Sequence, residues 1–152
     1  MISITSNLEN ITYSYWGSTI INPKGIIFSV DTMDQIGTDW EELPFWTPTH
    51  DQIIELEKRL QGYLEKHQPI NDHSVENVFE YGRQYWGLTR KGRKLIYVNA
   101  FCNPDDFTPR LDWSFDWRKN IVRVRDGGSC YFQAYYDPID KTFIELNFNG
   151  NT

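Results

Sequence analysis

Apolar residues recur with helical spacing in one part of the chain, between residues 48 and 67. Repeats of three and four positions place side chains on one face of a helix, and the residues of this stripe are Ile53, Leu56, Leu60 and Leu64. Thr47 before Pro48 fits an N-cap and the first helical position. Thr49 with Gln52 three residues later forms a competing capping box. The pattern predicts one long helix whose stripe faces a core.

After residue 81 the pattern changes to the two-residue alternation of strands. The predicted strands are residues 83–89, 94–102, 120–125, 130–137 and 142–148. Turn-forming residues predict three hairpin turns, at 90–93, 126–129 and 137–141. The apolar side of the alternation consists of Val122, Val124, Phe132, Ala134, Tyr136, Ile144, Leu146 and Phe148. The other side is mixed polar and aromatic, as in an antiparallel sheet with one covered and one wetter face.

The order of these elements predicts an α+β fold in which one long helix packs on a curved antiparallel meander sheet. Residues 25–30 predict one further strand before the helix. Residues 31–50 combine acidic and aromatic residues with turn formers, which indicates a loop. A length of 152 residues suits a single domain, residues 1–152.

Three stretches of the second half share a further pattern: RQYWGLTRKGRKLIYVNAFC, VRDGGSCYFQAYYDP and FIELNFNG. They contain an aromatic-Gly strand, an Ile-Tyr-x-Asn strand, an Asp-Gly-Gly hairpin and a closing Asn-Gly, and a WTPT helix start precedes them. This pattern resembles a group of uncharacterised bacterial small domains, mainly over residues 81–150. The resemblance implies a cystatin-like or NTF2-like fold with a helix on a sheet. It implies no catalytic residues, and the first 45 residues have no counterpart in it.

The cysteines and histidines show no pattern for catalysis or metal binding. Cys102 and Cys130 lie in predicted strands, which favours buried thiols, and a bridge between them requires Cα atoms within about 7 Å. The three histidines share no ligand spacing with each other or with the cysteines. The sequence contains neither a Gly-x-Ser-x-Gly elbow nor a phosphate-binding loop. We therefore predict no catalytic residue, no metal and no cofactor.

Charge is distributed unevenly along the chain, whose net charge is −6. Residues 1–80 contain 4 Lys or Arg and 13 Asp or Glu, whereas residues 81–152 contain 11 and 8. The acidic half disfavours a nucleic-acid partner, although basic residues interleaved with Tyr131 and Tyr135 also occur on RNA-binding sheets. The first ten residues lack the features of a signal peptide, and no run approaches the ~18 apolar residues of a membrane span. We therefore expect a cytoplasmic protein without a membrane partner.

Two segments combine aromatic anchors with acidic residues, the composition of a protein-binding loop. The candidate binding residues of the first segment, 34–46, are Asp39, Trp40, Glu41, Glu42, Phe45 and Trp46. Those of the second segment, 103–120, are Asp112, Trp113, Asp116 and Trp117. Two alternatives stay open for the second segment. Its aromatic residues fill the core as part of an edge strand, or Asp112 and Asp116 form a catalytic carboxylate pair.

These features together predict a non-enzymatic domain that binds a protein partner. The most concrete version is a bacterial immunity or antitoxin-type inhibitor of a toxin, because an acidic inhibitor complements a basic nuclease. The alternative is a small-molecule-binding or enzymatic NTF2-like domain with a pocket between helix and sheet. A third interpretation is a structural module that dimerises through its sheet.

Overall fold

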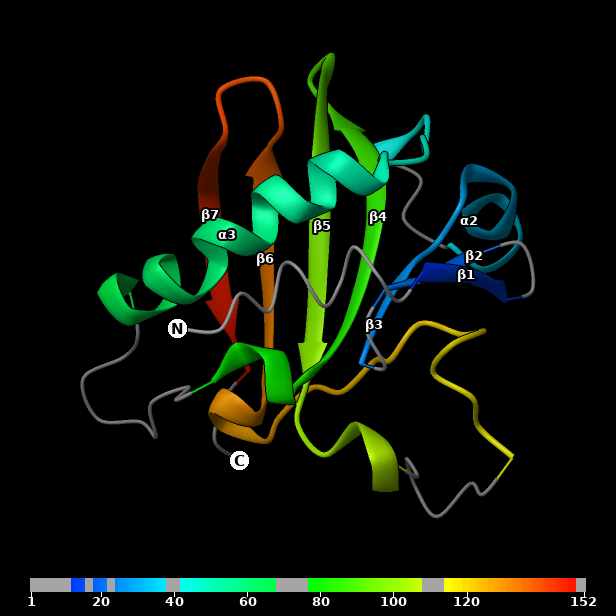
Figure 1. Cartoon of the computed structure of the whole chain (residues 1–152), viewed down its shortest axis with the longest axis vertical. Coiled ribbons are helices and arrows are strands. Elements are labelled where there is room, and N and C mark those ends of the chain that lie inside the picture. The colour runs from blue at the N-terminus through cyan, green and yellow to red at the C-terminus, as the bar shows by residue number, and fades with distance from the viewer. Residues whose placement is uncertain are drawn as a thin grey trace.

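The computed structural model shows an α+β architecture with one sheet and helices on its two faces (Figure 1). It describes residues 12–15, 18–21, 24–37, 42–67, 77–107 and 114–149. The α-helices within this part are α2 (Val30–Ile36) and α3 (His50–His67). Neither of them is long and apolar enough to cross a membrane. The α+β prediction is confirmed, whereas the expectation of one helix is wrong, because α2 formed in the region predicted as a loop.

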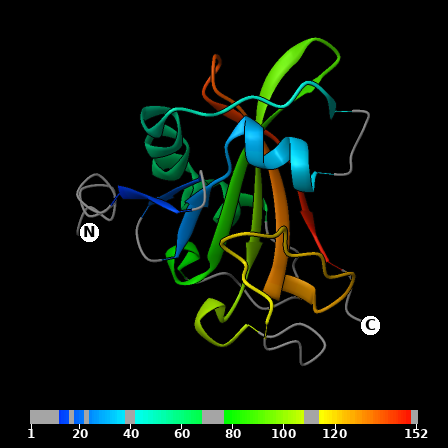
Figure 2. The ribbon, with the colours of Figure 1, turned by 90° about the vertical axis from the view of Figure 1, so that its right-hand side faces the viewer.

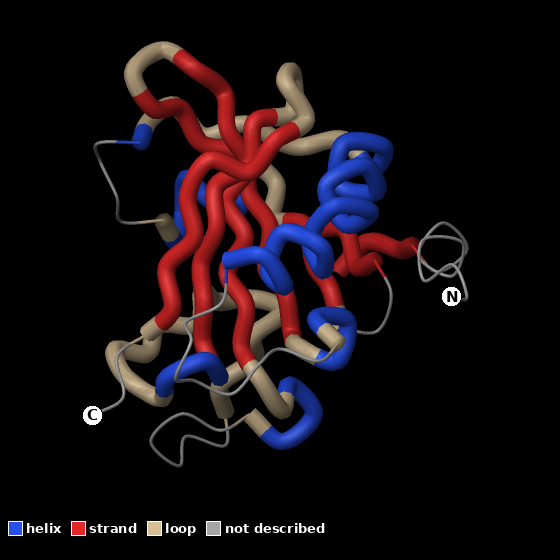
Figure 3. The backbone as a smooth tube through the Cα atoms, turned by 90° about the vertical axis from the view of Figure 1, so that its left-hand side faces the viewer, coloured by secondary structure: helices blue, strands red, loops and turns tan. Residues whose placement is uncertain are grey.

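The sheet contains seven strands within the described residues, and they are hydrogen-bonded in chain order (Figures 1 and 3). The strands are β1 (Thr12–Tyr15), β2 (Ser18–Ile21), β3 (Gly25–Ile27), β4 (Gly82–Arg90), β5 (Arg93–Phe101), β6 (Tyr131–Asp137) and β7 (Thr142–Phe148). All neighbours pair antiparallel except β3 and β4, which run parallel and are joined through both helices. The predicted meander therefore corresponds to β4 through β7, with three further strands added on one side.

Helix α3 begins two residues after its predicted start, because the competing capping box forms. The Thr49 backbone N–H donates to Gln52 Oε1 at 2.9 Å, and the Gln52 N–H donates to Thr49 Oγ1 at 3.1 Å. Thr47 instead accepts a hydrogen bond from the Val30 N–H, at the start of α2. Helix α2 was missed because it is only seven residues long and buries only Met33, too little for an apolar period.

Two of the three predicted turns are confirmed. Lys91 and Gly92, between β4 and β5, both have positive φ, as a two-residue hairpin loop requires. Between β6 and β7 the Asp137 carboxylate accepts hydrogen bonds from the Ile139 and Asp140 N–H groups.

The predicted face of β7 is only partly correct, because a register shift between β6 and β7 lies at Tyr135 and Tyr136. Phe143, Leu146 and Phe148 pack on the core beneath α3, whereas Ile144 points away and is 45% exposed. The predicted core face of β6, by contrast, is confirmed in full: Phe132, Ala134 and Tyr136 are all buried.

The predicted hairpin around the Gly-Gly pair is wrong. Residues 120–125 form no strand, and Gly127 and Gly128, both with positive φ, lead into the 3-10 helix η5 (Gly128–Cys130). The partners of β6 are instead β5 and β7. The chain thus leaves the sheet after β5, crosses its second face, and returns to the sheet at β6 (Figure 2).

A disulfide closes this excursion at its base, so the prediction of two buried thiols is wrong. Cys102 follows β5, Cys130 precedes β6, and their Cα atoms are 5.0 Å apart. The Cys102 N–H also donates to the Cys130 carbonyl at 2.8 Å. Because Phe101 pairs with Tyr131 in the sheet, the two cysteines extend the β5–β6 ladder by one position.

The sheet carries an apolar core on each face. Beneath α3, the stripe predicted from the sequence packs on side chains of β3 to β6. On the second face a separate core joins Met33 of α2, Trp86 and Phe101 of the sheet, and Trp117 and Val122 of the excursion. Strand β4 is buried on both sides, since neighbouring side chains Tyr85 and Trp86 enter different cores. The face expected to be wetter is therefore partly covered.

Candidate functional site

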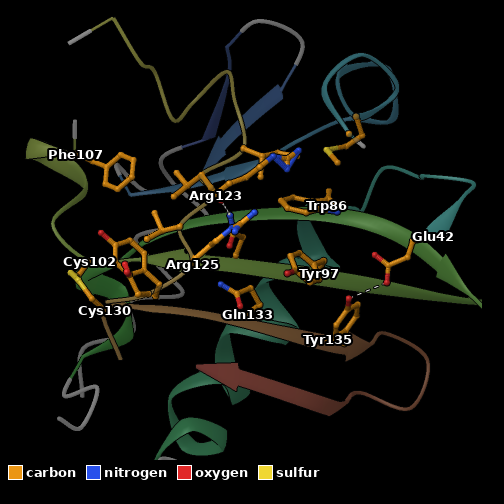
Figure 4. A pocket seen from close by; sticks show the side chains of 18 of the residues that line it. Glu42, Trp86, Tyr97, Cys102, Phe107, Arg123, Arg125, Cys130, Gln133 and Tyr135 are labelled. Carbon is orange, nitrogen blue, oxygen red and sulfur yellow. Dashed lines mark hydrogen bonds between the residues drawn. A yellow bond between two sulfur atoms is a disulfide. The ribbon is translucent and has the colours of Figure 1, made fainter. Parts of the chain in front are cut away.

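A large open depression lies on the second face of the sheet, the face opposite α3 (Figure 4). Its volume is about 1140 Å³. The floor comes from β4, β5 and β6, and the walls come from α2, residues 42–45 and residues 121–126. Glu42 and Tyr135 mark one end, and the Cys102–Cys130 disulfide marks the other (Figure 4).

Three aromatic side chains form one end of the floor. Alternation along the strands turns Trp86, Tyr97 and Tyr135 to this face, and register places them side by side on β4, β5 and β6. The ring centroids of Trp86 and Tyr97 are 4.7 Å apart, and those of Tyr97 and Tyr135 are 4.8 Å apart in an edge-to-face arrangement. This end of the floor is apolar and held in fixed geometry by neighbouring strands.

A charged cluster secures the same end. The Tyr135 hydroxyl donates to Glu42 at 3.0 Å, and Arg90 forms an ion pair with Glu42 at 3.1 Å. The Arg90 guanidinium also lies over the Tyr135 ring, 3.8 Å from its centroid, and pairs with Glu145. Burial, together with the charge of Glu42, raises the pKa of Tyr135 well above its ordinary value. Tyr135 therefore stays protonated at neutral pH and holds residue 42 at the rim.

Two side-chain amides beneath the depression hold its opposite wall. Gln84 Nε2 donates to the carbonyls of Trp117 and Asn120, at 2.6 and 2.8 Å. Gln84 Oε1 accepts from the Val122 N–H at 3.0 Å, and Asn99 Nδ2 donates to the Val122 carbonyl at 2.8 Å. Gln84 and Asn99 are themselves buried and hydrogen-bonded to each other. These amides hydrogen-bond to backbone N–H and C=O groups that would otherwise need a neighbouring strand as partner. Residues 120–125 can therefore pack on the face of the sheet without becoming one of its strands.

Two arginines, Arg123 and Arg125, stand on that wall. Arg123 and Arg125 alternate with buried or half-buried valines, so both guanidinium groups are exposed and line the depression (Figure 4). Arg123 Nη2 reaches the Ile36 carbonyl at 3.4 Å. Arg125 makes no ion pair with any described residue. Asn149 fixes the wall there by donating to the Val124 carbonyl at 2.6 Å.

The structure separates the residues predicted for binding in segment 34–46. Glu42 and Phe45 line the depression. Trp46 has a structural role: its indole N–H donates to the Leu88 carbonyl at 2.7 Å, and its backbone pairs with Gly87. Asp39, Trp40 and Glu41 lie outside the described residues. Their part in binding stays a prediction.

In segment 103–120 the aromatic residue that can be placed belongs to the core. Trp117 is 4% exposed, its indole N–H donates to the Pro104 carbonyl at 3.2 Å, and its ring packs edge-to-face on Phe101. Asp116 accepts a hydrogen bond from the Arg118 N–H at 2.9 Å. Asp112 and Trp113 lie outside the described residues. The interpretation in which aromatic residues of this segment fill the core is thus confirmed for Trp117, although no edge strand carries it.

Sequence reasoning did not assemble the depression, although part of its signal was visible. Alternation assigned Tyr131, Gln133 and Tyr135 to the mixed polar and aromatic face, and all three line the depression. The sequence also interleaves basic residues with Tyr131 and Tyr135, and two of these basic residues, Arg123 and Arg125, line the depression as well. What the alternation could not show was that residues 121–126 form a wall opposite these side chains.

A second cluster of polar residues lies beneath α3, between the helix and the sheet. Arg83, Glu57 and Tyr85 are buried, with exposed fractions of 0%, 2% and 0%. Tyr85 donates to Glu57 Oε2 and accepts from Arg83 Nε at 2.9 Å, and Arg83 Nε lies 3.4 Å from Glu57 Oε2. Burial raises the pKa of Glu57, against the opposing effect of Arg83. Since this cluster is closed to solvent, it is part of the core and offers no entry for a ligand.

Comparisons with known proteins do not identify the chain. No protein-family model matches it, and no curated protein or solved structure matches it either. Within the described residues, no three or more His, Cys, Asp or Glu side chains come close enough together to hold a metal ion.

Proposed function

We propose that this protein is a non-enzymatic binding domain that holds a segment of a protein partner in the sheet-face depression. The observation that carries the proposal is the combination of size and lining. A volume of about 1140 Å³, open to solvent, exceeds the roughly 300–1,000 Å³ typical of pockets that enclose a small molecule. Trp, Tyr and Arg, which line it, are the residue types that dominate binding energy at protein interfaces.

The rigidity of the floor supports the same proposal. Trp86, Tyr97 and Tyr135 are fixed by three neighbouring strands, and Tyr135 is held further by Glu42 and Arg90. A partner that binds here orders few side chains, so little conformational entropy is lost on association. This arrangement is a preorganised surface, which suits recognition without a chemical step.

The alternative of a pocket between helix and sheet has less support. The buried side chains that fill the core beneath α3 are between 0% and 3% exposed, and the buried carboxylate of Glu57 there is paired with Arg83 and Tyr85. The depression lies on the opposite face. We retain the cystatin-like or NTF2-like assignment as a proposal about the fold, supported by the long helix across an antiparallel meander.

An immunity or antitoxin-type inhibitor remains the most specific form of the proposal. It is supported by the net charge of −6 and by Glu42 at the rim, which follows Asp39 and Glu41 within three positions of the sequence. A basic partner bound in this way loses affinity when Asp39 and Glu41 are changed to lysine, because the long-range attraction becomes repulsion. Unchanged affinity at low salt rejects the inhibitor version and leaves the depression itself unaffected.

The disulfide bears on where the protein acts. A bond between Cys102 and Cys130 favours an oxidising compartment, because cytosolic thiols are kept reduced. The cytoplasmic location expected from the sequence therefore stays a prediction. Labelling of free thiols in protein isolated from its native cells distinguishes the two: two reactive cysteines support the cytoplasm, and none supports an oxidising compartment.

Site-specific photo-crosslinking tests the proposed function. p-Benzoylphenylalanine replaces Tyr97, on the floor of the depression, or Glu65, an exposed residue of α3 on the opposite face. In extracts of the native cells we expect a discrete cross-linked protein from position 97 and none from position 65. The proposal is rejected if position 65 captures the same protein equally well, or if only position 65 captures one.

A further inference from the structure

We infer that the depression recognises an extended peptide segment that carries a carboxylate side chain, which binds at Arg123 and Arg125. The inference rests on the proposed function and names the chemistry of its partner. In this arrangement an apolar side chain of the segment lies on the aromatic end of the floor. The carboxylate lies further along the depression, at the wall that carries the two arginines.

The length of the floor fits an extended segment. Along β5 the floor runs from Tyr97 at the aromatic end to Cys102 at the disulfide end. Along β6 it runs from Tyr135 to Cys130. Five steps of about 3.3 Å span roughly 16 Å, so the floor accommodates about five residues of extended chain. A compact ligand at either end leaves the other end empty.

The aromatic end is suited to an apolar side chain and not to a cation. Its only described acidic group is Glu42, whose carboxylate already pairs with Arg90 and accepts from Tyr135. The remaining surface there consists of the rings of Trp86, Tyr97 and Phe45. Burial of an apolar side chain against these rings is favourable by the area removed from water.

The arginine end is suited to a carboxylate. Arg125 makes no ion pair with a described residue, and Arg123 reaches only a backbone carbonyl. Two guanidinium groups two residues apart on one wall present forked donors whose geometry matches a carboxylate. Asp126 is the one described acidic residue of the lining at this end, which leaves the positive charge in excess.

Single-stranded nucleic acid, which also combines stacking with arginine contacts, fits the site less well. Base stacking requires a ring with a free face, but the Tyr135 ring is covered by Arg90. Glu42 and Asp126 in the lining, and the net charge of −6, oppose a phosphate backbone. The observations thus favour a peptide.

Calorimetry with two peptides that differ in one group tests the inference. The first is a capped hexapeptide with a phenylalanine and a glutamate three residues apart, and the second has glutamine in place of the glutamate. We expect the glutamate peptide to bind about tenfold more tightly, because an ion-paired hydrogen bond is lost in the glutamine peptide. In the Arg125→Gln variant this preference disappears. In the control Lys66→Gln, which removes an exposed positive charge from α3 on the opposite face, the preference is retained.

Each other outcome overturns the inference. Equal affinity for the two peptides shows that the site does not recognise a carboxylate. Failure of both peptides to bind at millimolar concentration shows that the site does not bind an extended peptide of this kind. Tighter binding of a ten-nucleotide single-stranded RNA assigns the site to nucleic acid instead. The cross-link from position 97 separates these failures from failure of the proposed function, because it reports whether any protein occupies the depression.

Discussion

Asn99 donates its side-chain amide to Oε1 of Gln84 at 2.9 Å, and this buried pair carries the wall of the depression. Between them, the two amides bind backbone groups of Trp117, Asn120 and Val122. The position of the wall therefore depends on these two side chains of the sheet, because the wall residues themselves form neither a helix nor a strand. Removal of either amide leaves buried backbone groups without partners.

The first prediction concerns Gln84. Gln84→Met keeps the length of the side chain but removes three hydrogen bonds to residues 117–122, so we expect a loss of about 2–4 kcal/mol in the free energy of unfolding. Urea denaturation measures the loss, and hydrogen exchange at the Val122 amide reports the released wall. Gln35→Met, at an exposed position of α2, is the matched control. A Gln84→Met protein as stable as the control contradicts the structural role of this amide.

The second prediction concerns pH. Because the pKa of Glu57 is raised in the folded protein, its protonated form stabilises the fold below the unfolded pKa of about 4.5. That contribution is lost as pH rises through the folded pKa. Relative to Glu57→Gln, which does not titrate, the unmodified protein should lose stability between pH 4 and pH 7. Denaturation of both proteins at the two pH values measures the difference.

Glu65→Gln, on the exposed surface of the same helix, is the control for this pH experiment. Its stability relative to the unmodified protein should change little over the same range. If Glu57→Gln instead loses stability relative to the unmodified protein as pH rises, the folded protein lowers the pKa of Glu57, and the prediction is wrong.

The third prediction concerns the ion pair between Glu57 and Arg83. Arg83→Met leaves the buried Glu57 carboxylate without its counter-charge, which we expect to cost about 3–5 kcal/mol of folding stability. The double variant Glu57→Met/Arg83→Met removes both charges and should recover most of that loss. Chemical denaturation of the two single variants and the double variant completes the cycle. Simple additivity of the two losses argues that the charges do not interact.

The fourth prediction concerns the disulfide. The sequence separation of the two cysteines is 28. Closing a loop of this length lowers the conformational entropy of the unfolded chain, which stabilises the folded state by about 3–4 kcal/mol. We expect Cys102→Ser/Cys130→Ser to lose stability of this order. The unmodified protein in excess dithiothreitol should unfold at the same urea concentration as the variant. If the oxidised protein and the variant unfold together, the disulfide does not stabilise the fold.

Local patterns of the sequence predicted the elements whose partners are close along the chain. The stripe from Ile53 to Leu64 predicted α3, and turn residues at 90–93 predicted the β4–β5 hairpin. A capping box and a two-residue loop involve only neighbouring residues, so their physics is contained in a short stretch. The alternation in β6 assigned its faces correctly for the same reason.

The elements that were predicted wrongly depend on distant partners. Residues 120–125 alternate valine with polar residues like a strand, but their backbone bonds to amide side chains of Gln84, Asn99 and Asn149. No property of the segment itself distinguishes an amide partner from a strand partner. The outward turn of Ile144 has a similar origin, because the β6–β7 register shift is set by the pairing of two strands.

The candidate site divides in the same way. The floor residues were visible as one face of an alternating sheet, whereas the open depression required knowledge of where the β5–β6 excursion lies. Cys102 and Cys130 illustrate this, because each is unremarkable in its own segment and they meet only when β5 and β6 are neighbours.

The most direct test of the binding account measures affinity for the protein captured from position 97. Isothermal titration compares the unmodified chain with Tyr97→Ala, on the floor of the depression, and with Tyr63→Ala, on α3 at the opposite face. We predict that Tyr97→Ala weakens binding tenfold or more, roughly the effect of removing an aromatic anchor, and that Tyr63→Ala leaves it unchanged. Unchanged affinity in Tyr97→Ala, with a loss in Tyr63→Ala, would contradict the account and move the binding surface to α3.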